Sequence, residues 1–292
     1  MTLVAEGLSI RRGSAHDVDI CSSIFHQAFS MVNSQHGFPS EVPTLEDGKH
    51  LLHLLFLDQN FQFLVAEMDG RVIGSVFLDE RTEIIGIGPI SVGPDAQFGG
   101  IGRMLMIAAL DKARQRSSMG IRLMQASFNV QSLSLYAKLG FAVQEPMAVM
   151  AGLPIEPRAI IPDRRVRVAV PADLAAANNI CRKVYGFDRS IELKAAIERK
   201  DALVVEHKDR IAGYASGFGY LAHAVCESAL EMQALLSHAD RIDGTGIFIP
   251  TRNRELFHWC LENGMRVIIP YTHMTIGSYI PPNGAYIPSV HF

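Results

Sequence analysis

The chain has 292 residues, of which 48% are hydrophobic and 20% are charged, and its net charge is −3. This composition is that of a globular protein long enough for two domains, and the balanced charge argues against nucleic acid or an anionic membrane as the main partner. The four cysteines lie far apart and form no C-x-x-C pair, which fits reduced thiols rather than disulfides or a zinc site. We recognise no signal peptide and no apolar run of 18 residues, and we therefore expect a cytoplasmic protein without a membrane segment.

Hydrophobic periodicity predicts alternating strands and helices in the first half of the chain. The predicted elements are, in order, strand 9–12, a helix that starts near 15–17, strands 61–67, 71–78 and 84–92, a helix after a glycine-rich turn, strand 121–127, a helix near 131–139 and strand 141–150. Asp17 is expected as a first-turn acid or cap, and Asp69-Gly70 is typical of a hairpin turn. The pattern indicates a mixed α/β fold with helices that follow strands.

Pro89 lies inside the strand-like run 84–92. Because proline cannot donate a hydrogen bond to a sheet, this position indicates an edge or a bulge. A bulge would let neighbouring strands splay, and the backbone of Ile90 and Val92 could then pair with an extended ligand that carries amides. Taken alone, Pro89 favours the simpler interpretation, a plain edge strand.

Three glycines, at 99, 100 and 102, separate this strand from a helix with an amphipathic stripe. The amides of residues 99–103 have no intrahelical partner, and they lie at the positive end of the helix dipole. A phosphate would be held there by several N–H groups, and a Cβ would obstruct it. Neither G-x-G-x-x-G nor a P-loop is present, so we predict a phosphate-binding turn of another kind, with a flexible surface turn as the alternative.

A second segment of interest follows strand 121–127. Asn129 precedes the next helix, on which Ser132 and Tyr136 lie four residues apart and share a face. By itself, Tyr136 would more often be a packed aromatic residue than a catalyst.

Together the two segments resemble the GNAT-type N-acetyltransferase superfamily. The stretch 97–102 is similar to the Q/R-x-x-G-x-G/A signature, and 129–141 is similar to the N-x-x-S…LY-x-K-x-GF segment. The resemblance implies a splayed sheet that binds acetyl-CoA as cosubstrate, without a metal. The residues implied in cofactor binding are Ile90 and Val92 along the pantetheine, Gln97, Phe98, Gly99, Gly100, Ile101, Gly102 and Arg103 around the pyrophosphate, and Asn129 and Ser132.

The implied reaction is direct attack of an amine on the thioester, and Tyr136 is implied as the acid that protonates the leaving thiolate. Glu83 is our candidate for the base, followed by Asp79 and Glu80, although each could be a solvated turn charge and a water chain could serve instead. We expect a small-molecule or peptide amine as acceptor, and an oxygen or sulfur acceptor stays open. A non-catalytic acyl-CoA sensor or scaffold is the alternative function.

Three segments of the first half recur in order in the second half, at 166–186, 202–216 and 253–265. We therefore predict a GNAT domain at 1–152 and a degenerate GNAT-like domain at 164–292, joined by a Pro-rich linker. The second copy lacks the glycine turn and has Cys260 in place of Tyr136, so we expect it to pack on the first copy, cover the acceptor cleft or form a homodimer surface.

Three smaller expectations complete the sequence analysis. The tail 278–292 contains a Pro-Asn-Gly turn between two strand-like pieces, which predicts a closing hairpin. In proteins similar to this one, the region 29–43 lines the acceptor site, which makes His36 and Phe38 candidate contacts. His50 and His53 are interpreted as residues of a helix face rather than metal ligands.

Overall fold

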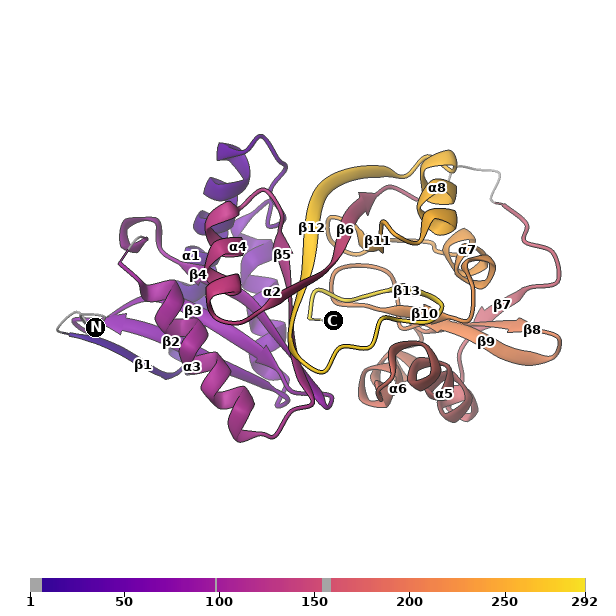
Figure 1. The fold of residues 1–292 in the computed structure, drawn as a ribbon, viewed down its shortest axis with the longest axis horizontal. Helices are drawn as coiled ribbons and strands as arrows, with labels where there is room; N and C mark the ends of the chain where they lie inside the picture. The colour runs from indigo at the N-terminus through magenta and orange to yellow at the C-terminus, as the bar shows by residue number, and fades with distance from the viewer. Residues whose placement is uncertain (1–6, 98, 154–158, 292) are drawn as a thin grey trace.

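A computed structural model describes residues 7–97, 99–153 and 159–291 (Figure 1). The first half contains β1 (Leu8–Arg12), α1 (Ala15–Gln35), α2 (Leu45–Leu57), β2 (Phe61–Met68), β3 (Arg71–Asp79), β4 (Ile84–Val92), α3 (Ile101–Gln115), β5 (Gly120–Ala126), α4 (Val130–Lys138) and β6 (Ala142–Ala151). The second half contains β7 (Arg165–Val168), α5 (Leu174–Tyr185), α6 (Ser190–Arg199), β8 (Leu203–His207), β9 (Arg210–Ala215), β10 (Ala224–Cys226), α7 (Ala229–Ser237), β11 (Ile247–Pro250), α8 (Arg254–Glu262), β12 (Arg266–Gly277) and β13 (Ala285–Ile287). The mixed α/β fold is confirmed, and the strands and helices predicted for the first half are all present within a few residues.

Two layers of helices cover the first-half sheet. One hydrophobic cluster joins α1 and α2 to β2 and β3, and a second joins α3 and α4 to the opposite face of β2, β3, β4 and β5. The start of α1 follows the prediction, since Ser14 is the N-cap and Asp17 completes its capping box. Asp69 and Gly70 both have positive φ, as a tight hairpin turn requires.

The first ten elements of the second half repeat, in the same order, the elements of the first half. β7 to β12, with their helices, correspond one by one to β1 to β6, and only β13 has no counterpart. The caps also correspond, since Asn129 accepts a hydrogen bond from Ser132 N–H at the start of α4 and Asn253 accepts one from Leu256 N–H at the start of α8. This order supports an internal duplication.

The two halves exchange their last strands. The larger sheet has the order β1-β2-β3-β4-β5-β12-β6-β11, so β12 of the second half lies between β5 and β6 of the first half (Figure 1). β6 in turn pairs with β11, along Met147–Met150 and Ile247–Pro250. The boundaries 1–152 and 164–292 stay predictions. The larger sheet takes strands from both ranges, whereas the five-stranded sheet β13-β10-β9-β8-β7 lies within the second range.

β4 and β5 separate partway along their length. They pair in parallel only over Ile84–Gly86 and Gly120–Arg122, although β4 continues to Val92 and β5 to Ala126. A register shift between β3 and β4 falls at Pro89. Of the two alternatives that this proline left open, the bulge is therefore present, and the plain edge strand, which Pro89 alone favoured, is wrong because β4 pairs with both β3 and β5. The result is a gap in the sheet that opens toward the glycine turn.

The corresponding gap of the second half is filled by the chain itself. β13 pairs antiparallel with β10 and also contacts β11, so it lies where an extended ligand would lie in the first half. The hairpin predicted for the tail is therefore wrong, because β13 pairs with β10 rather than with the segment before it. The local pattern identified a strand but could not identify its distant partner.

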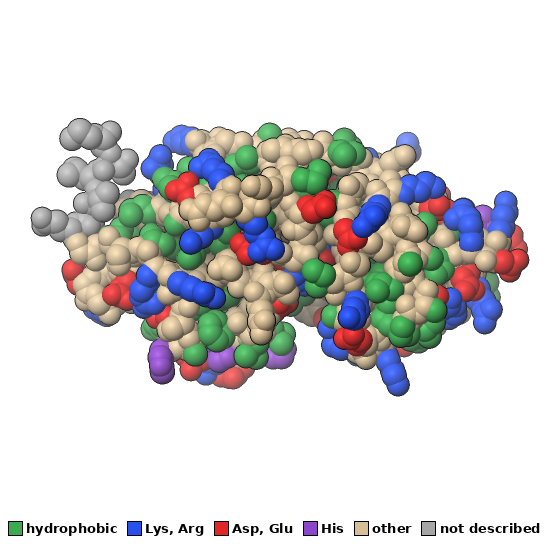
Figure 2. All heavy atoms as spheres, turned by 90° about the horizontal axis from the view of Figure 1, so that it is seen from below, with side chains coloured by type: hydrophobic (Ala, Val, Ile, Leu, Met, Phe, Trp, Pro, Cys, Tyr) green, Lys and Arg blue, Asp and Glu red, His purple; other side chains and the backbone are tan. Residues whose placement is uncertain are grey.

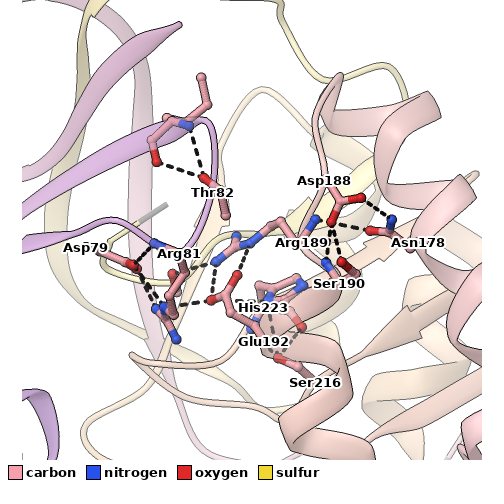
Figure 3. A network of polar contacts seen from close by, with 12 residues as sticks. Asp79, Arg81, Thr82, Asn178, Asp188, Arg189, Ser190, Glu192, Ser216 and His223 are labelled. Carbon is pink, nitrogen blue, oxygen red and sulfur yellow. Dashed lines mark hydrogen bonds and ion pairs between the residues drawn. The ribbon is translucent and has the colours of Figure 1, made fainter. Parts of the chain in front are cut away.

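A buried network of charges joins the halves. Figure 3 shows Arg81, which follows β3, and Arg189, which precedes α6, both directed at Glu192. Glu192 lies 3.1 Å from Arg81 and 2.5 Å from Arg189, and all three side chains are largely buried. Burying such charges is tolerable only while every partner stays in place, so the network fixes the second half against the β3–β4 turn.

Candidate functional site

The glycine turn leaves the N-terminal end of α3 without a side-chain cap. Gly100 is the N-cap with φ of 77°, and its carbonyl accepts the hydrogen bond from Met104 N–H, which lies one turn further along the helix. An added Cβ at Gly100 would meet no atom within 4 Å, and both Gly99 and Gly100 are exposed. The amides of Ile101, Gly102 and Arg103 therefore begin the helix at an open surface. Phe98 lies outside the described residues.

The edge of β4 along the gap offers backbone hydrogen-bonding groups. Gly93 N–H bonds to the carbonyl of Ile73 and Ser91 lies opposite Ser75, so these residues face β3. Since hydrogen-bonding direction alternates along a strand, Ile90 and Val92 face the gap. The predicted alignment of these two residues is thus compatible with the strand geometry. The Gln97 side chain donates to the Val92 carbonyl at 3.3 Å.

Asn129 and Ser132 are both engaged in the start of α4. Ser132 Oγ donates to the Asn129 carbonyl at 2.9 Å and accepts from Gln125 at 3.0 Å. This is a structural role in capping the helix, and their predicted contact with a cofactor stays a prediction.

Tyr136 lies on α4 and is buried beside Phe141, with 8% of its surface exposed. Burial raises the pKa of the Tyr136 phenol to about 12. Among the described residues, no hydrogen bond to its hydroxyl is found. A buried phenol that keeps its proton can donate it to an anion formed nearby.

The predicted candidates for the base lie beyond the paired stretch of β4 and β5, on the side away from the gap. Glu83 is exposed and precedes the paired stretch of β4, where it lines a cavity of about 570 Å³ on the far side of the β4–β5 pairing. Asp79 is bound by Arg81 at 2.5 Å and Glu80 is bound by Arg116. The structure therefore does not bring these three carboxylates to the gap.

Glu41 is a carboxylate that the sequence analysis did not single out. It lies between α1 and α2 and accepts a hydrogen bond from the Tyr271 hydroxyl of β12. Burial raises the pKa of Glu41 to about 7, although the hydrogen bond from Tyr271 works in the opposite direction. Glu41 falls within the region 29–43, but nothing local marks it, because its partner is 230 residues away.

The C-terminal tail returns to the first half. His291 Nε2 lies 2.8 Å from the carbonyl of Gly88 in the β4 bulge, and its ring packs edge-on against Phe61. The Val290 amide donates to the carbonyl of Tyr220. Burial lowers the pKa of His291, so the ring is neutral near pH 7. The tail therefore covers the face of β4 opposite α3.

The second half lacks the features of the first-half site. Ser228 caps α7 by accepting from Leu230 N–H, and it also donates to Glu231, so this helix has a side-chain cap where α3 has an open turn. Cys260 is buried, and burial raises the pKa of its thiol to about 12. A thiol in that state is neither a ready nucleophile nor a ready acid.

Comparison with known proteins finds a family match in the first half. Residues 25–141 match the family described as Acetyltransferase (GNAT) family. A mycothiol acetyltransferase from Nocardia farcinica is 34% identical over 76 residues, which are 25% of this chain and 25% of that protein. The chain thus matches about a quarter of this curated relative.

Two solved structures match nearly the whole chain. An acetyltransferase of inferred activity from Pyrococcus horikoshii superposes with a TM-score of 0.74 at 21% identity, over 96% of this chain and 92% of that one. A GCN5-related N-acetyltransferase from Sphaerobacter thermophilus superposes with a TM-score of 0.65 at 12% identity, over 96% and 99% of the two chains. At these identities the matches show the fold, in which both halves take part.

Within the described part of the chain, no three or more His, Cys, Asp or Glu side chains form a cluster suited to a metal ion. No helix in the described ranges has the length and hydrophobicity needed to cross a bilayer. His53 pairs with Asp19 at 3.0 Å on the exposed surface of α2.

Proposed function

We propose that the protein is an acetyl-CoA-dependent N-acetyltransferase whose active site lies in the gap between β4 and β5. The observation that carries this proposal is the convergence of three features on one gap. These are an uncapped glycine turn, a free strand edge and the buried phenol of Tyr136, which packs in the hydrophobic cluster that α3, α4, β4 and β5 share. They lie in the part of the chain that matches the GNAT family.

The residues around the gap suit the parts of acetyl-CoA. The amides of 99–103 suit the pyrophosphate, because they lie at an exposed helix N-terminus. The β4 edge at Ile90 and Val92 suits the amides of the pantetheine arm, and an N–H group there would polarise the thioester carbonyl. Tyr136 would donate its proton, or a hydrogen bond, to the departing thiolate.

The acceptor is proposed to be the primary amine of a small molecule or a peptide. Figure 2 shows basic and acidic side chains interspersed on the face seen from below, without a broad field of one sign. That distribution offers a polyanion no large basic surface on this side.

The four cysteines are free and buried, which suits a reducing compartment, and we place the protein in the cytoplasm.

Binding and turnover test the proposal in two steps. Isothermal titration should show one CoA site per chain, with the affinity reduced in a Gly100→Asp variant, since a carboxylate would repel the pyrophosphate. A thiol-release assay with acetyl-CoA and a panel of primary amines should then detect turnover. CoA binding without turnover on any amine would favour the alternative, an acyl-CoA sensor, and absence of CoA binding would refute both.

A further inference from the structure

We propose that Glu41 is the general base of the reaction and that the second half of the chain positions it through Tyr271. The inference rests on the proposed function and assigns to its active site a residue of the loop between α1 and α2. It also gives the second half a defined role, since Tyr271 belongs to the exchanged strand β12.

Strand register places Tyr271, the hydrogen-bond partner of Glu41, at the end of β5 that borders the gap. The last β4–β5 pair is Gly86–Arg122, and four residues further along the two strands are Ile90 and Ala126. Tyr271 lies opposite Ala126 in the β5–β12 pairing, and its hydroxyl binds Glu41. The hydrogen bond from Tyr271 therefore ties the carboxylate to the end of β5, where the gap to β4 has opened.

The loop that carries Glu41 is anchored on both sides of it. Before Glu41, the Asn33 amide group donates to the Pro39 carbonyl at 3.0 Å, and the Phe38 ring stacks on Phe128 with 4.4 Å between centroids. After Glu41, the Val42 side chain is buried and its carbonyl lies 3.0 Å from His26 Nδ1. These contacts hold the carboxylate at a fixed place, as a base requires.

The surroundings of Glu41 favour proton uptake near neutral pH. The groups that act on it are the phenols of Tyr271 on β12 and Tyr220 in the segment after β9, and the amide of Asn33 on α1. No ion pair with Lys or Arg is found for Glu41 within the described residues. Desolvation thus outweighs the hydrogen bonds and raises its pKa to about 7.

The proton balance of the step is complete with these groups. An ammonium acceptor gives one proton to Glu41, and the neutral amine then attacks the thioester carbonyl carbon, which forms the C–N bond. The C–S bond breaks, and the thiolate takes a proton from Tyr136, which recovers one from the acylated nitrogen. Glu41 finally releases its proton to water, so the products are an amide, a free thiol and one proton.

The walls around Glu41 indicate the class of acceptor. Tyr220 and Tyr271 border it from the second half, and Phe38 and Phe128 form a stacked pair that packs on the same hydrophobic cluster as Tyr271. Aromatic faces around a single carboxylate suit an ammonium group attached to an apolar body. We therefore expect arylalkyl monoamines to be better substrates than polyamines.

The test compares pH profiles with 2-phenylethylamine as the acceptor. For the wild type, kcat/KM should rise with pH along an acid limb with an apparent pKa near 7. E41Q should lose about 10²-fold or more in kcat/KM and also lose this limb. Y271F should keep activity but move the limb to higher pH, because the phenol stabilises the charged carboxylate. E46Q, at an exposed position of α2, is the matched control.

Two outcomes would overturn the inference. One is full activity of E41Q with its acid limb intact, and the other is a loss in E83Q that E41Q does not show. If the wild type turns over no amine at all, the proposed function fails instead. The pKa of Glu41 can then still be measured by an NMR titration of the ¹³C-labelled glutamate carboxyls. A resonance that titrates near pH 7 and is missing in E41Q is expected, and titration of Glu41 near pH 4 would refute the inference.

Discussion

The hydroxyl of Tyr136 keeps its proton throughout the neutral range, because burial holds the pKa of the phenol near 12. Its replacement by phenylalanine should lower kcat about 10²-fold, with little change in the KM for acetyl-CoA. The variant should unfold at nearly the wild-type temperature, since no hydrogen bond of the hydroxyl within the described residues is lost. Steady-state kinetics and a thermal melt check this, and an unchanged kcat would remove the assignment.

The cysteines should be inert in the native protein. All four are buried, and burial raises the pKa of each thiol, to about 12 for Cys21 and about 11 for Cys181. Since the thiolate is the reactive form, a disulfide reagent such as DTNB should label almost none of them in the folded chain and all four in denaturant. Rapid labelling of the native protein would contradict the burial. If the native cysteines do not react with DTNB, they also add no background to the thiol-release assay.

At the scale of elements, the glycine turn allows a matched comparison of two neighbours. Gly100 has a positive φ, whereas Gly99 does not and would place a Cβ in ordinary contact at 3.6 Å. Gly100→Ala should destabilise the fold by about 1–2 kcal/mol, because an L-residue is strained in this region. Gly99→Ala should change the free energy of unfolding little. Urea denaturation of the two variants checks this, and equal stabilities would show that the turn is not held in the left-handed conformation.

The elements also show which features local sequence can predict and which it cannot. The glycine turn and the role of Asp17 at the start of α1 were predicted because each depends on residues within a few positions, and Pro89 marked the site of a bulge without excluding an edge strand. The exchange of β6 and β12 and the pairing of β13 with β10 depend on partners far along the chain, and alternation in one strand does not specify its neighbour. Glu41 was missed for the same reason, because its environment is completed by Tyr271.

For the whole molecule, the described parts of the two halves form one structural unit, and the features proposed to bind the cofactor lie in the first half. The exchange of strands places Tyr271 beside Glu41, while β13 occupies the gap that would otherwise be a second site. In the proposed mechanism, the duplicated half would support the acceptor side of the first half rather than repeat its chemistry. The network around Glu192 holds this arrangement, and its response to pH is open to measurement.

The buried His223 is expected to make the molecule sensitive to acid. It is buried, its Nε2 lies 2.8 Å from the Tyr214 hydroxyl, and burial together with Arg189 lowers its pKa to about 3. The unfolded chain takes up this proton near pH 6.5 and the folded chain does not, so stability is lost as pH falls from about 6.5 toward 3, by about 1.4 kcal/mol per pH unit for this group. His223→Gln should be less stable at pH 7.5 through the altered hydrogen bonds, but its free energy of unfolding should fall less steeply with acid. Urea denaturation between pH 7.5 and 4.5 measures both slopes, with His50→Gln, at an exposed position of α2, as the control. Parallel curves for the wild type and His223→Gln would mean that His223 does not stay neutral in the folded protein.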